Sequence, residues 1–410
     1  MKEKKLPIME KTGKRSRVAL ILESSRAYSR ELIEGIAQYN REAGGWQIDF
    51  SPRGLNDAPP SWLQSWKGDG IIARINDPVL LKAISSHKVP VVDLRRVHLF
   101  PGIPQIGPDY SKVTRLLFQH FRDRGYHSLA FFGYHELGSN FVSKKKAGSA
   151  PPIPVMQTEI VLEQLAKNHD CRFAAFRTGS EQKREDIKGK SAVQLLKWLS
   201  ELPVYTAIIA ANDEMALHVL QGCRQVGREV PDDLAVAGIG NDECLCTLGL
   251  PPLTSVDLAA DRVGYEAAEM LDRMMKDPRW SPPPSTLVPP REVVIRASTD
   301  MIATADPVLA SAVRFIRERV CSGITVQEVL RHVHLSRVAL ENRFKRELHR
   351  TIHQEIIEAR IRRVGELLAT TSFSFRRIAE ETGFEYPEYM MRVFREKMGK
   401  TLKEYREENS

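Results

Sequence analysis

Two short segments near the end of the chain carry polar side chains at helical spacing. In the earlier segment Leu340, Phe344 and Leu348 recur at every fourth residue, which predicts one buried helix face. The side chains left facing outward are Val338, Glu341, Asn342 and Lys345, and the corresponding set in the later segment is Glu388, Tyr389, Arg392 and Arg395. Asn and Arg can form paired hydrogen bonds with adenine and guanine, and Glu can accept one from cytosine. The two segments are therefore candidates for reading base edges in double-stranded DNA.

These segments are matching parts of an internal repeat. Laying residues 326–355 over residues 376–405 pairs Val329 with Ala379, Leu340 with Met390, and Phe344 with Phe394. Each copy predicts two short helices separated by a tight break. Gly383 tolerates the positive φ that ends a helix, while Ser336 and Pro387 suit the starts of helices. This is the geometry of a helix-turn-helix unit, whose second helix enters the major groove. On periodicity alone, two helical hairpins with solvated basic faces remain an alternative.

A different group of candidates lies where predicted strands end. Asp93 closes the run VPVVD (89–93), Asn212 and Asp213 follow AIIAA (207–211), and Tyr28 and Arg30 open the helix after the first strand. Carboxylates and amides can hydrogen-bond pairs of hydroxyls, and an aromatic face suits the C–H side of a sugar ring. These residues predict a site for a small sugar or another polar effector. The alternatives are a helix-terminal role for Asp213, favoured by the helix dipole, and plain helix-face roles for Tyr28 and Arg30.

Short apolar runs alternate with helical stretches up to about residue 240. Buried strands are expected at 18–22, 70–75, 89–94, 129–133, 171–176, 207–211 and 234–240, with helices at 30–42, 111–124, 191–201 and 214–227. Continuous apolar strands separated by helices predict parallel sheets covered on both faces. We expect two such sheets in series, the first ending near Tyr126 and the second near Gly240. The helix 261–276 and the strand-like segment 293–296 then cross back between the two lobes.

After Pro307 the strand-like runs disappear and helical periodicity continues almost to the end. We therefore divide the chain into a basic tail (1–17), a two-lobed α/β effector-binding domain (18–297), a linker (298–306) and an all-α DNA-binding domain (307–410). Residues 307–410 carry 20 Lys and Arg against 15 Asp and Glu, a net +5 of the chain's formal +8. Clustered basic residues suit a polyanionic partner such as DNA.

Composition and motifs exclude several other classes of protein. No apolar run is long enough to cross a bilayer, and residues 1–17 lack the apolar core of a signal peptide, so we expect a cytoplasmic protein with no membrane partner. The cysteines, which show no CxxC spacing and no matched His cluster, predict reduced thiols and no metal site; they are Cys171, Cys223, Cys244, Cys246 and Cys321. GxSxG, GxxxxGK[ST], GxGxxG and HExxH motifs are absent, so we expect neither an enzyme nor a cofactor.

The motifs of the C-terminal domain follow a definite order along the chain. They are Ser336…Leu340…Arg343-Phe344, Arg360-Ile361…Leu367-Leu368, Ile378-Ala379…Gly383-Phe384, then Phe394, Gly399, Thr401 and Tyr405-Arg406. This order strongly resembles the AraC-type family of transcription regulators. The resemblance implies two recognition helices in successive major grooves on one DNA face, held apart by the long helix at about 351–369. The family's base-facing positions match Val338, Glu341, Asn342, Glu388, Tyr389 and Arg392, while Arg337, Lys345 and Arg395 are expected on phosphates.

The N-terminal half has a resemblance of its own. The stretches VALILESSRAYSRELIEGIAQYNRE (18–42), AIIAANDEMALHVLQGCRQVGREVPDDLAVAGIGNDE (207–243) and PPLTSVDL (251–258) are similar to the LacI-type periplasmic-binding-protein fold. That fold implies hinged closure on a ligand, with Asp93, Asn212 and Asp213 at ligand-contacting positions and Asn241 beside another. Joined to an AraC-type C-terminus, the whole chain resembles regulators of xylose operons. The resemblance implies a homodimer on operator half-sites, a small sugar effector with D-xylose as the candidate, and an activator of a pentose catabolic operon that contacts RNA polymerase.

Two departures from the LacI-type pattern leave the effector open. Gly240 stands where the fold usually carries an acidic residue, and SKKKAG (143–148) replaces a stretch that normally supplies an Arg, with Lys145 the nearest match. Lys cannot form the two parallel hydrogen bonds of Arg, so these changes weaken or alter sugar preference. The alternative is a regulator of the same architecture that senses another small ligand or none, through a degenerate sugar site. A transport-associated binding protein is the rival that the fold alone allows, but it needs a signal peptide and has no use for the C-terminal repeat.

Overall fold

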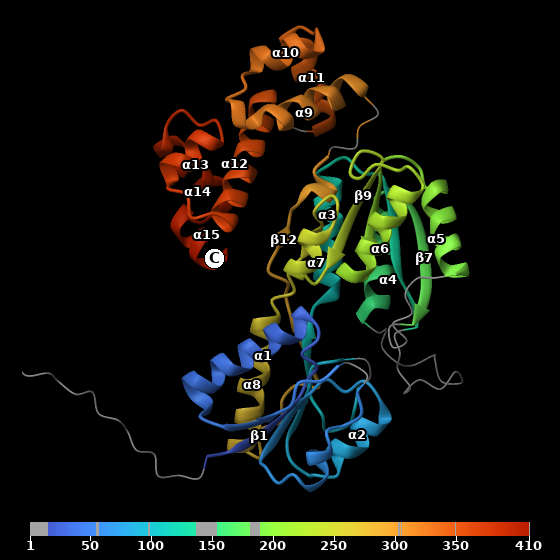
Figure 1. Ribbon diagram of the computed structural model, residues 1–410, viewed down its shortest axis with the longest axis vertical. Helices are drawn as coiled ribbons and strands as arrows, with labels where there is room; N and C mark the ends of the chain where they lie inside the picture. Colours follow the sequence, from blue (N-terminus) through green and yellow to red (C-terminus); the bar gives the residue numbers. More distant parts are fainter. Residues whose placement is uncertain are drawn as a thin grey trace, which may run out of the picture. The chain divides into compact units, whose positions relative to one another are not determined.

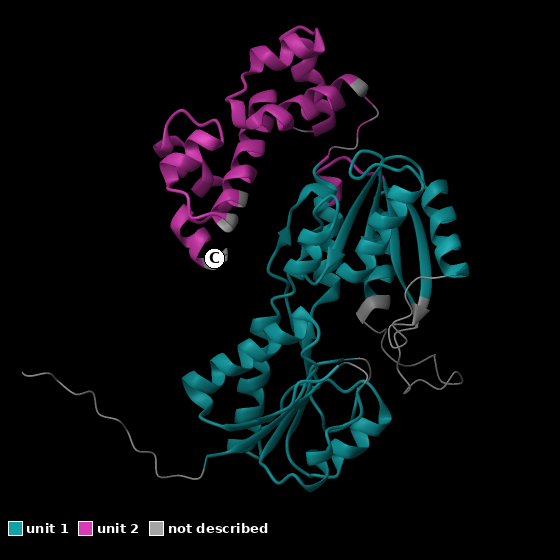
Figure 2. Cartoon of the chain, viewed as in Figure 1, with its two compact units in different colours: residues 1–120, 128–300 teal, residues 121–127, 301–410 magenta. Residues whose placement is uncertain are grey.

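The computed structural model describes residues 15–54, 57–96, 99–136, 154–180, 189–301, 304, 306–348 and 350–409. The chain divides into two compact units, residues 1–120 with 128–300 and residues 121–127 with 301–410 (Figure 2). Within the described ranges, none of the helices combines the length and apolar character needed to span a membrane.

The N-terminal sheet of the first unit is parallel throughout, with strand order β11-β5-β4-β3-β1-β2. Its strands are β1 (Arg17–Ile21), β2 (Gln47–Phe50), β3 (Gly70–Ala73), β4 (Val91–Asp93), β5 (Gln105–Pro108) and β11 (Ser285–Val288). Both faces are covered, as expected for strands with continuous apolar runs: β1 is apolar from Val18 to Ile21 and β3 is apolar throughout. Val18 and Leu20 pack with helices α1 (Ala27–Tyr39) and α8 (Ala260–Lys276), whereas Ala19 and Ile21 pack with α2 (Pro78–Ser85) on the opposite face (Figure 1).

The second sheet has the order β12-β10-β9-β8-β6-β7 and is parallel except for β12. Its strands are β6 (Ser128–Glu136), β7 (Arg172–Ser180), β8 (Thr206–Ala210), β9 (Leu234–Ile239), β10 (Thr254–Val256) and β12 (Val293–Val294). The helices of this part of the chain are α3 (Tyr110–Arg122), α4 (Pro154–Asn168), α5 (Lys190–Glu201), α6 (Asp213–Gln225) and α7 (Glu243–Leu248).

The predicted two-sheet α/β fold is confirmed, and every strand expected from an apolar run is present. The expectation that the second sheet ends near Gly240 is wrong, because β10 and β12 extend it. β10, like β2 and β5, is short and partly polar, so it leaves no continuous apolar run in the sequence, whereas β12 lies in the predicted strand-like segment 293–296.

The chain returns to the N-terminal sheet after β10, as the sequence predicted. Helix α8 packs along α1 and β11 joins β5, before β12 adds to the second sheet. The two helices approach closely because each has a glycine at the crossing. A Cβ on Gly35 would lie 1.8 Å from the carbonyl oxygen of Asp261, and a Cβ on Gly264 would lie 2.0 Å from that of Leu32. Backbone meets backbone at this crossing, which leaves no room for a methyl group.

The C-terminal helices form two hydrophobic cores. Helices α9 (Pro307–Arg319), α10 (Val326–Val333) and α11 (Arg337–Leu348) surround the first, while α13 (Phe375–Glu381), α14 (Pro387–Met398) and α15 (Leu402–Asn409) surround the second. Helix α12 (Ile352–Thr370) belongs to both, since Ile352 and Ile356 pack in the first core and Val364 and Leu368 in the second. The predicted all-α domain with two helix-turn-helix units is confirmed.

The segment expected to link the two units begins inside the first one. Ser298 and Thr299 are buried, and Ser298 Oγ donates a hydrogen bond of 2.6 Å to the carbonyl oxygen of Val236. At the other end, Asp306 caps α9 by accepting hydrogen bonds from the backbone of Val308 and Leu309. Residues 302, 303 and 305 lie outside the described residues.

We expect Gly264→Ala to destabilise the first unit by about 1–3 kcal/mol or more, because the added methyl group meets backbone that cannot rotate away. Gly365→Ala on α12 is the matched control. A Cβ there would lie 3.4 Å from the Tyr405 hydroxyl, which is an ordinary contact. The higher helix propensity of alanine is therefore expected to raise the stability of the second unit by up to about 1 kcal/mol. Denaturant unfolding followed by tryptophan fluorescence reports the first unit, where all 5 tryptophans lie, and circular dichroism reports both units. Equal effects of the two substitutions would contradict the close helix crossing.

Candidate functional site

The predicted effector residues lie at the carboxyl ends of parallel strands, the edge at which open α/β sheets bind ligands. Tyr28 and Asp93 lie at this edge of the N-terminal sheet, and Asn212, Asp213 and Asn241 lie at that of the second sheet. Arg26, just before α1, forms an ion pair of 3.7 Å with Glu214 in the first turn of α6. Because these two residues follow β1 and β8, the ion pair brings the two strand edges toward each other.

Asp93 is fully buried, and protein groups donate to its carboxylate. The backbone N–H groups of Ile75, Arg95 and Arg96 donate at 2.9, 3.0 and 3.2 Å, and Gln105 Nε2 donates at 2.8 Å. Burial raises the pKa of the Asp93 carboxyl, and the three backbone hydrogen bonds oppose that rise. In this arrangement Asp93 fixes the loops after β3 and β4.

Asp213 occupies a similar position in the second sheet. Ser255 Oγ donates to its carboxylate at 2.5 Å and the backbone N–H of Asp242 at 2.8 Å, while burial raises the pKa of Asp213 to about 6. The carboxylate fills the space beside β9: a Cβ on Gly238 would lie 2.1 Å from Asp213 Oδ1, and a Cβ on Gly240 would lie 3.2 Å from Oδ2. Gly240 also has a φ of 131°. A side chain at position 240 would meet the Asp213 carboxylate, which explains why this chain has Gly240 where the LacI-type fold usually carries an acidic residue.

The two asparagines of this edge also have partners in the protein. Asn212 caps α6, since its side-chain oxygen accepts a hydrogen bond of 2.8 Å from the backbone of Met215. Asn241 adopts a φ of 53°, and its side-chain oxygen accepts a hydrogen bond of 3.0 Å from Arg296 Nη2. Arg296 further donates to the carbonyl oxygen of Leu253 at 2.9 Å. It directly precedes the 3-10 turn Ala297–Thr299, in which Ser298 and Thr299 are buried, so it ties the loop after β9 to the segment that leaves the first unit.

The N-terminal edge holds a buried ion pair that sequence-based reasoning missed. Arg74 donates to the carboxylate of Glu23 and, at 2.8 Å, to Ser29 Oγ. Its guanidinium carbon lies 5.3 Å from the centre of the Tyr28 ring. The Tyr28 hydroxyl is buried and has no hydrogen-bond partner among the described residues, and burial raises its pKa. This hydroxyl can bind a ligand without first breaking a bond to the protein. The signal for the pair was an Arg inside the apolar run GIIARI.

Arg30, also predicted to contact the effector, is not part of these clusters. Arg30 is exposed on α1, and its Nη1 donates a hydrogen bond of 3.1 Å to the carbonyl oxygen of Ser24. Lys145 lies outside the described residues.

Helix α11 presents most of its predicted DNA-facing residues to solvent. Val338 is 70% exposed, and Arg337, Asn342 and Lys345 are exposed as well, whereas Glu341 is half-buried. The predicted inward set of Leu340, Phe344 and Leu348 is buried. Ser336 Oγ accepts a hydrogen bond of 3.3 Å from the backbone of Ala339, which agrees with the predicted N-cap.

Helix α14 presents Glu388, Arg392 and Arg395, all exposed. Tyr389 is half-buried instead, with its ring packed edge-on against Phe384 at 5.9 Å between centres. The guanidinium carbon of Arg392 lies 5.4 Å from the centre of the Tyr389 ring. The Tyr389 ring thus packs against the Arg392 guanidinium and remains partly exposed to solvent.

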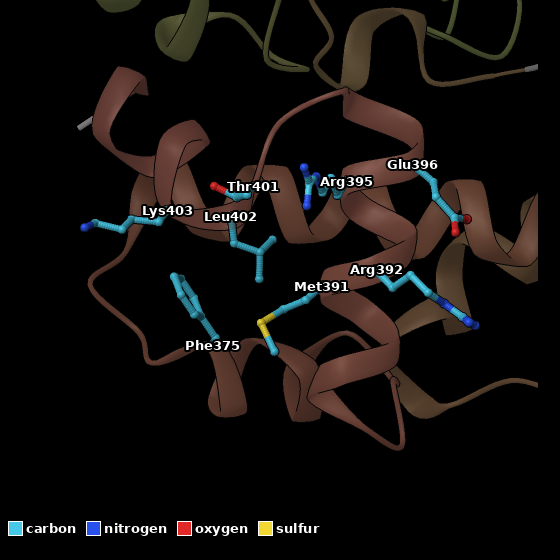
Figure 3. A pocket seen from close by; sticks show the side chains of 8 residues that line it. All are labelled: Phe375, Met391, Arg392, Arg395, Glu396, Thr401, Leu402 and Lys403. Atoms are coloured by element: carbon cyan, nitrogen blue, oxygen red, sulfur yellow. The ribbon is translucent and has the colours of Figure 1, made fainter.

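A surface hollow of about 790 Å³ adjoins α14. Phe375, Met391 and Leu402 form its apolar floor, and Arg392, Arg395 and Lys403 supply basic groups around it. In Figure 3, Phe375 and Met391 point toward each other across the hollow, while Arg392 and Lys403 point outward on opposite sides. Basic groups around a recognition helix are the arrangement that holds a DNA phosphate strand.

Comparison with known proteins covers both units. Family models match at residues 17–107 (XylR N-terminal domain), 118–299 (periplasmic binding protein-like domain) and 329–408 (helix-turn-helix domain). The xylose operon regulatory protein of Escherichia coli (strain K12) is 32% identical over 407 residues, covering 97% of this chain and 98% of the relative. The protein of that name from Haemophilus influenzae is 30% identical over 395 residues, covering 95% and 98%.

Solved structures agree with these relatives. A structure of the xylose-binding transcription activator xylR is 31% identical, covers 97% of this chain and 99% of that chain, and gives a TM-score of 0.61. A LacI family transcriptional regulator from Enterococcus faecium with bound ribose is 16% identical, covers 71% of this chain and all of its own, and at a TM-score of 0.54 shows the fold of the sensing unit. The chain therefore belongs to the xylose operon regulators, a family of transcription regulators and not of enzymes, in which a periplasmic-binding-protein-like unit is joined to an AraC-type DNA-binding domain.

Proposed function

We propose that this chain is a D-xylose-responsive activator of a pentose catabolic operon. The observation that carries the proposal is that the likeness to xylose operon regulators extends over both the sensing and the DNA-binding parts of the chain. In this proposal the protein acts in the cytoplasm as a homodimer on paired operator half-sites and contacts RNA polymerase there.

The sugar binds at the carboxyl ends of the strands. Tyr28 and Arg74 contact it from the N-terminal sheet, and Asn212 and Asn241 from the second sheet, with Arg30 and Lys145 as further contacts. Asp93 and Asp213 act mainly by holding the loops that carry these groups, because their carboxylates accept hydrogen bonds from Gln105, Ser255 and backbone N–H groups.

Arg296 offers a route from the effector to DNA. Its side chain donates a hydrogen bond to Asn241, and it directly precedes the turn Ala297–Thr299, in which Ser298 and Thr299 are buried. If sugar binding moves the loop that carries Asn241, the start of the segment between the units moves with it. In a homodimer, such a movement changes the spacing of the two DNA-binding domains.

A second candidate is a regulator of the same architecture that senses another small polar ligand or none. The observation that favours it concerns Asp93 and Asp213, which were expected to accept hydrogen bonds from sugar hydroxyls. Both carboxylates already accept hydrogen bonds from protein side chains. Arg74 and Arg96 lie near Tyr28, and a guanidinium group donates hydrogen bonds but cannot accept them. The carboxyl edge of the N-terminal sheet therefore also suits a ligand rich in acceptor groups.

Tyr28→Phe is expected to weaken D-xylose binding about threefold to tenfold, because it removes only a hydroxyl that has no partner in the described structure. Tyr39→Phe is the matched control. The Tyr39 hydroxyl donates to Asp272 at 2.9 Å inside the helix layer, so its loss lowers stability and leaves sugar affinity unchanged. Isothermal titration calorimetry with D-xylose, L-arabinose, D-ribose and D-glucose measures the affinities. If Tyr28→Phe binds D-xylose with wild-type affinity, the Tyr28 hydroxyl does not contact the sugar. If the wild type binds none of the four sugars, the second candidate function is favoured.

On DNA, Arg392→Ala is expected to cost about 1–3 kcal/mol and to relax preference at one base pair, because Arg392 faces a base edge. Arg395→Ala, on the same helix, is expected to weaken binding to all sequences alike, since Arg395 contacts phosphate. The probe is a duplex selected from a random pool by the wild-type chain, titrated together with its single-base variants. Uniform weakening by Arg392→Ala would assign Arg392 to phosphate instead.

A further inference from the structure

The two helix-turn-helix units touch at a second place besides their shared helix α12. The turn at Gly383, between α13 and α14, lies against the turn at residues 320–323, between α9 and α10. A Cβ on Gly383 would come within 2.8 Å of both the backbone nitrogen of Gly323 and the carbonyl oxygen of Val320. Gly383 also has a φ of 71°. Since both neighbouring atoms belong to backbone, no side-chain rotation can make room there.

Arg360 reinforces the same contact from the middle of α12. Its Nη2 donates a hydrogen bond of 3.0 Å to the carbonyl oxygen of Ile324, which belongs to the core of the first helix-turn-helix unit. Its guanidinium carbon lies 5.6 Å from the centre of the ring of Phe384, which belongs to the core of the second helix-turn-helix unit. The half-buried Arg360 side chain therefore contacts both helix-turn-helix units at the point where their turns meet.

A single long helix fixes the distance between two units but still bends and twists. A second contact away from the helix axis removes that freedom. The turns at 320–323 and Gly383, together with Arg360, provide this contact, which we name the inter-unit joint. They hold α11 and α14 in one relative orientation.

We infer that Gly383 and Arg360 are positioning residues that set the spacing, within one half-site, between the two DNA segments that α11 and α14 contact. The inference rests on the proposed function, in which α11 and α14 read successive major grooves. Insertion of one base pair between the two contacted segments moves one of them by about 3.4 Å and rotates it about the DNA axis. A rigid joint cannot follow that displacement, whereas a loosened joint can.

The test measures spacing preference with full-length protein by fluorescence anisotropy. The probes are the duplex selected by the wild type, the same duplex with one base pair inserted between the contacted segments, and two versions with one segment scrambled. We expect wild type to prefer the selected spacing over the insertion by about tenfold or more. Gly383→Ala and Arg360→Met are expected to reduce that preference to less than about threefold, while their affinity for each scrambled duplex stays within about twofold of wild type.

Gly399→Ala is the matched control, because Gly399 also has a positive φ of 70° but a Cβ there would have nothing within 4 Å. It is expected to keep the wild-type spacing preference. Arg360→Met decides the question if Gly383→Ala does not fold. The inference is overturned if Arg360→Met keeps the full preference, or if Gly399→Ala loses as much of it as Gly383→Ala. A wild type that binds the scrambled duplexes as tightly as the selected one would instead overturn the two-groove proposal, and this inference with it.

Discussion

The contact between α1 and α8 is the constraint on which the sensing unit depends. Gly35 and Gly264 let the two helices meet backbone to backbone. This contact holds α8 in the N-terminal lobe together with β11, although β10 before α8 and β12 after β11 belong to the second sheet. Each lobe is therefore built from separate stretches of chain, and the segments between them are the places where one lobe can turn against the other. Hinged closure needs only a few such segments, provided that each lobe is rigid.

Rigidity at the strand edges comes from buried carboxylates. Asp93 and Asp213 are both inaccessible, and each binds loops that follow neighbouring strands. Because both oxygens of each carboxylate already accept hydrogen bonds from the protein, a more open group for an effector is the Tyr28 hydroxyl, which has no partner among the described residues and lies next to the Glu23–Arg74 pair. The chemistry of the site is thus set as much by which polar groups are already satisfied as by which are present.

The sequence predicted the fold well wherever a strand was long and apolar or a helix had a clear buried face. It failed at β2, β5 and β10, whose few residues give no period and which are strands because a neighbouring strand offers hydrogen bonds. For the site, residue type and position at a strand end located Asp93 and Asp213, but their partners come from distant segments, as Ser255 does for Asp213. The role of Arg296, at the end of the strand-like segment 293–296, escaped notice because its partners Asn241 and Leu253 also come from distant parts of the chain. The exposed faces of α11 and α14 followed from local periodicity, with Glu341 and Tyr389 more covered than expected.

A sugar-responsive regulator requires that a ligand in the sensing unit change the affinity of the other unit for DNA. This coupling is measured as the affinity of the full-length protein for its selected duplex, by fluorescence anisotropy, with and without saturating D-xylose. Because coupling between two sites is reciprocal, D-xylose is expected to raise DNA affinity by about fivefold or more, and the duplex to raise D-xylose affinity by the same factor. Binding of D-xylose that leaves DNA affinity unchanged would show that the two units are not coupled.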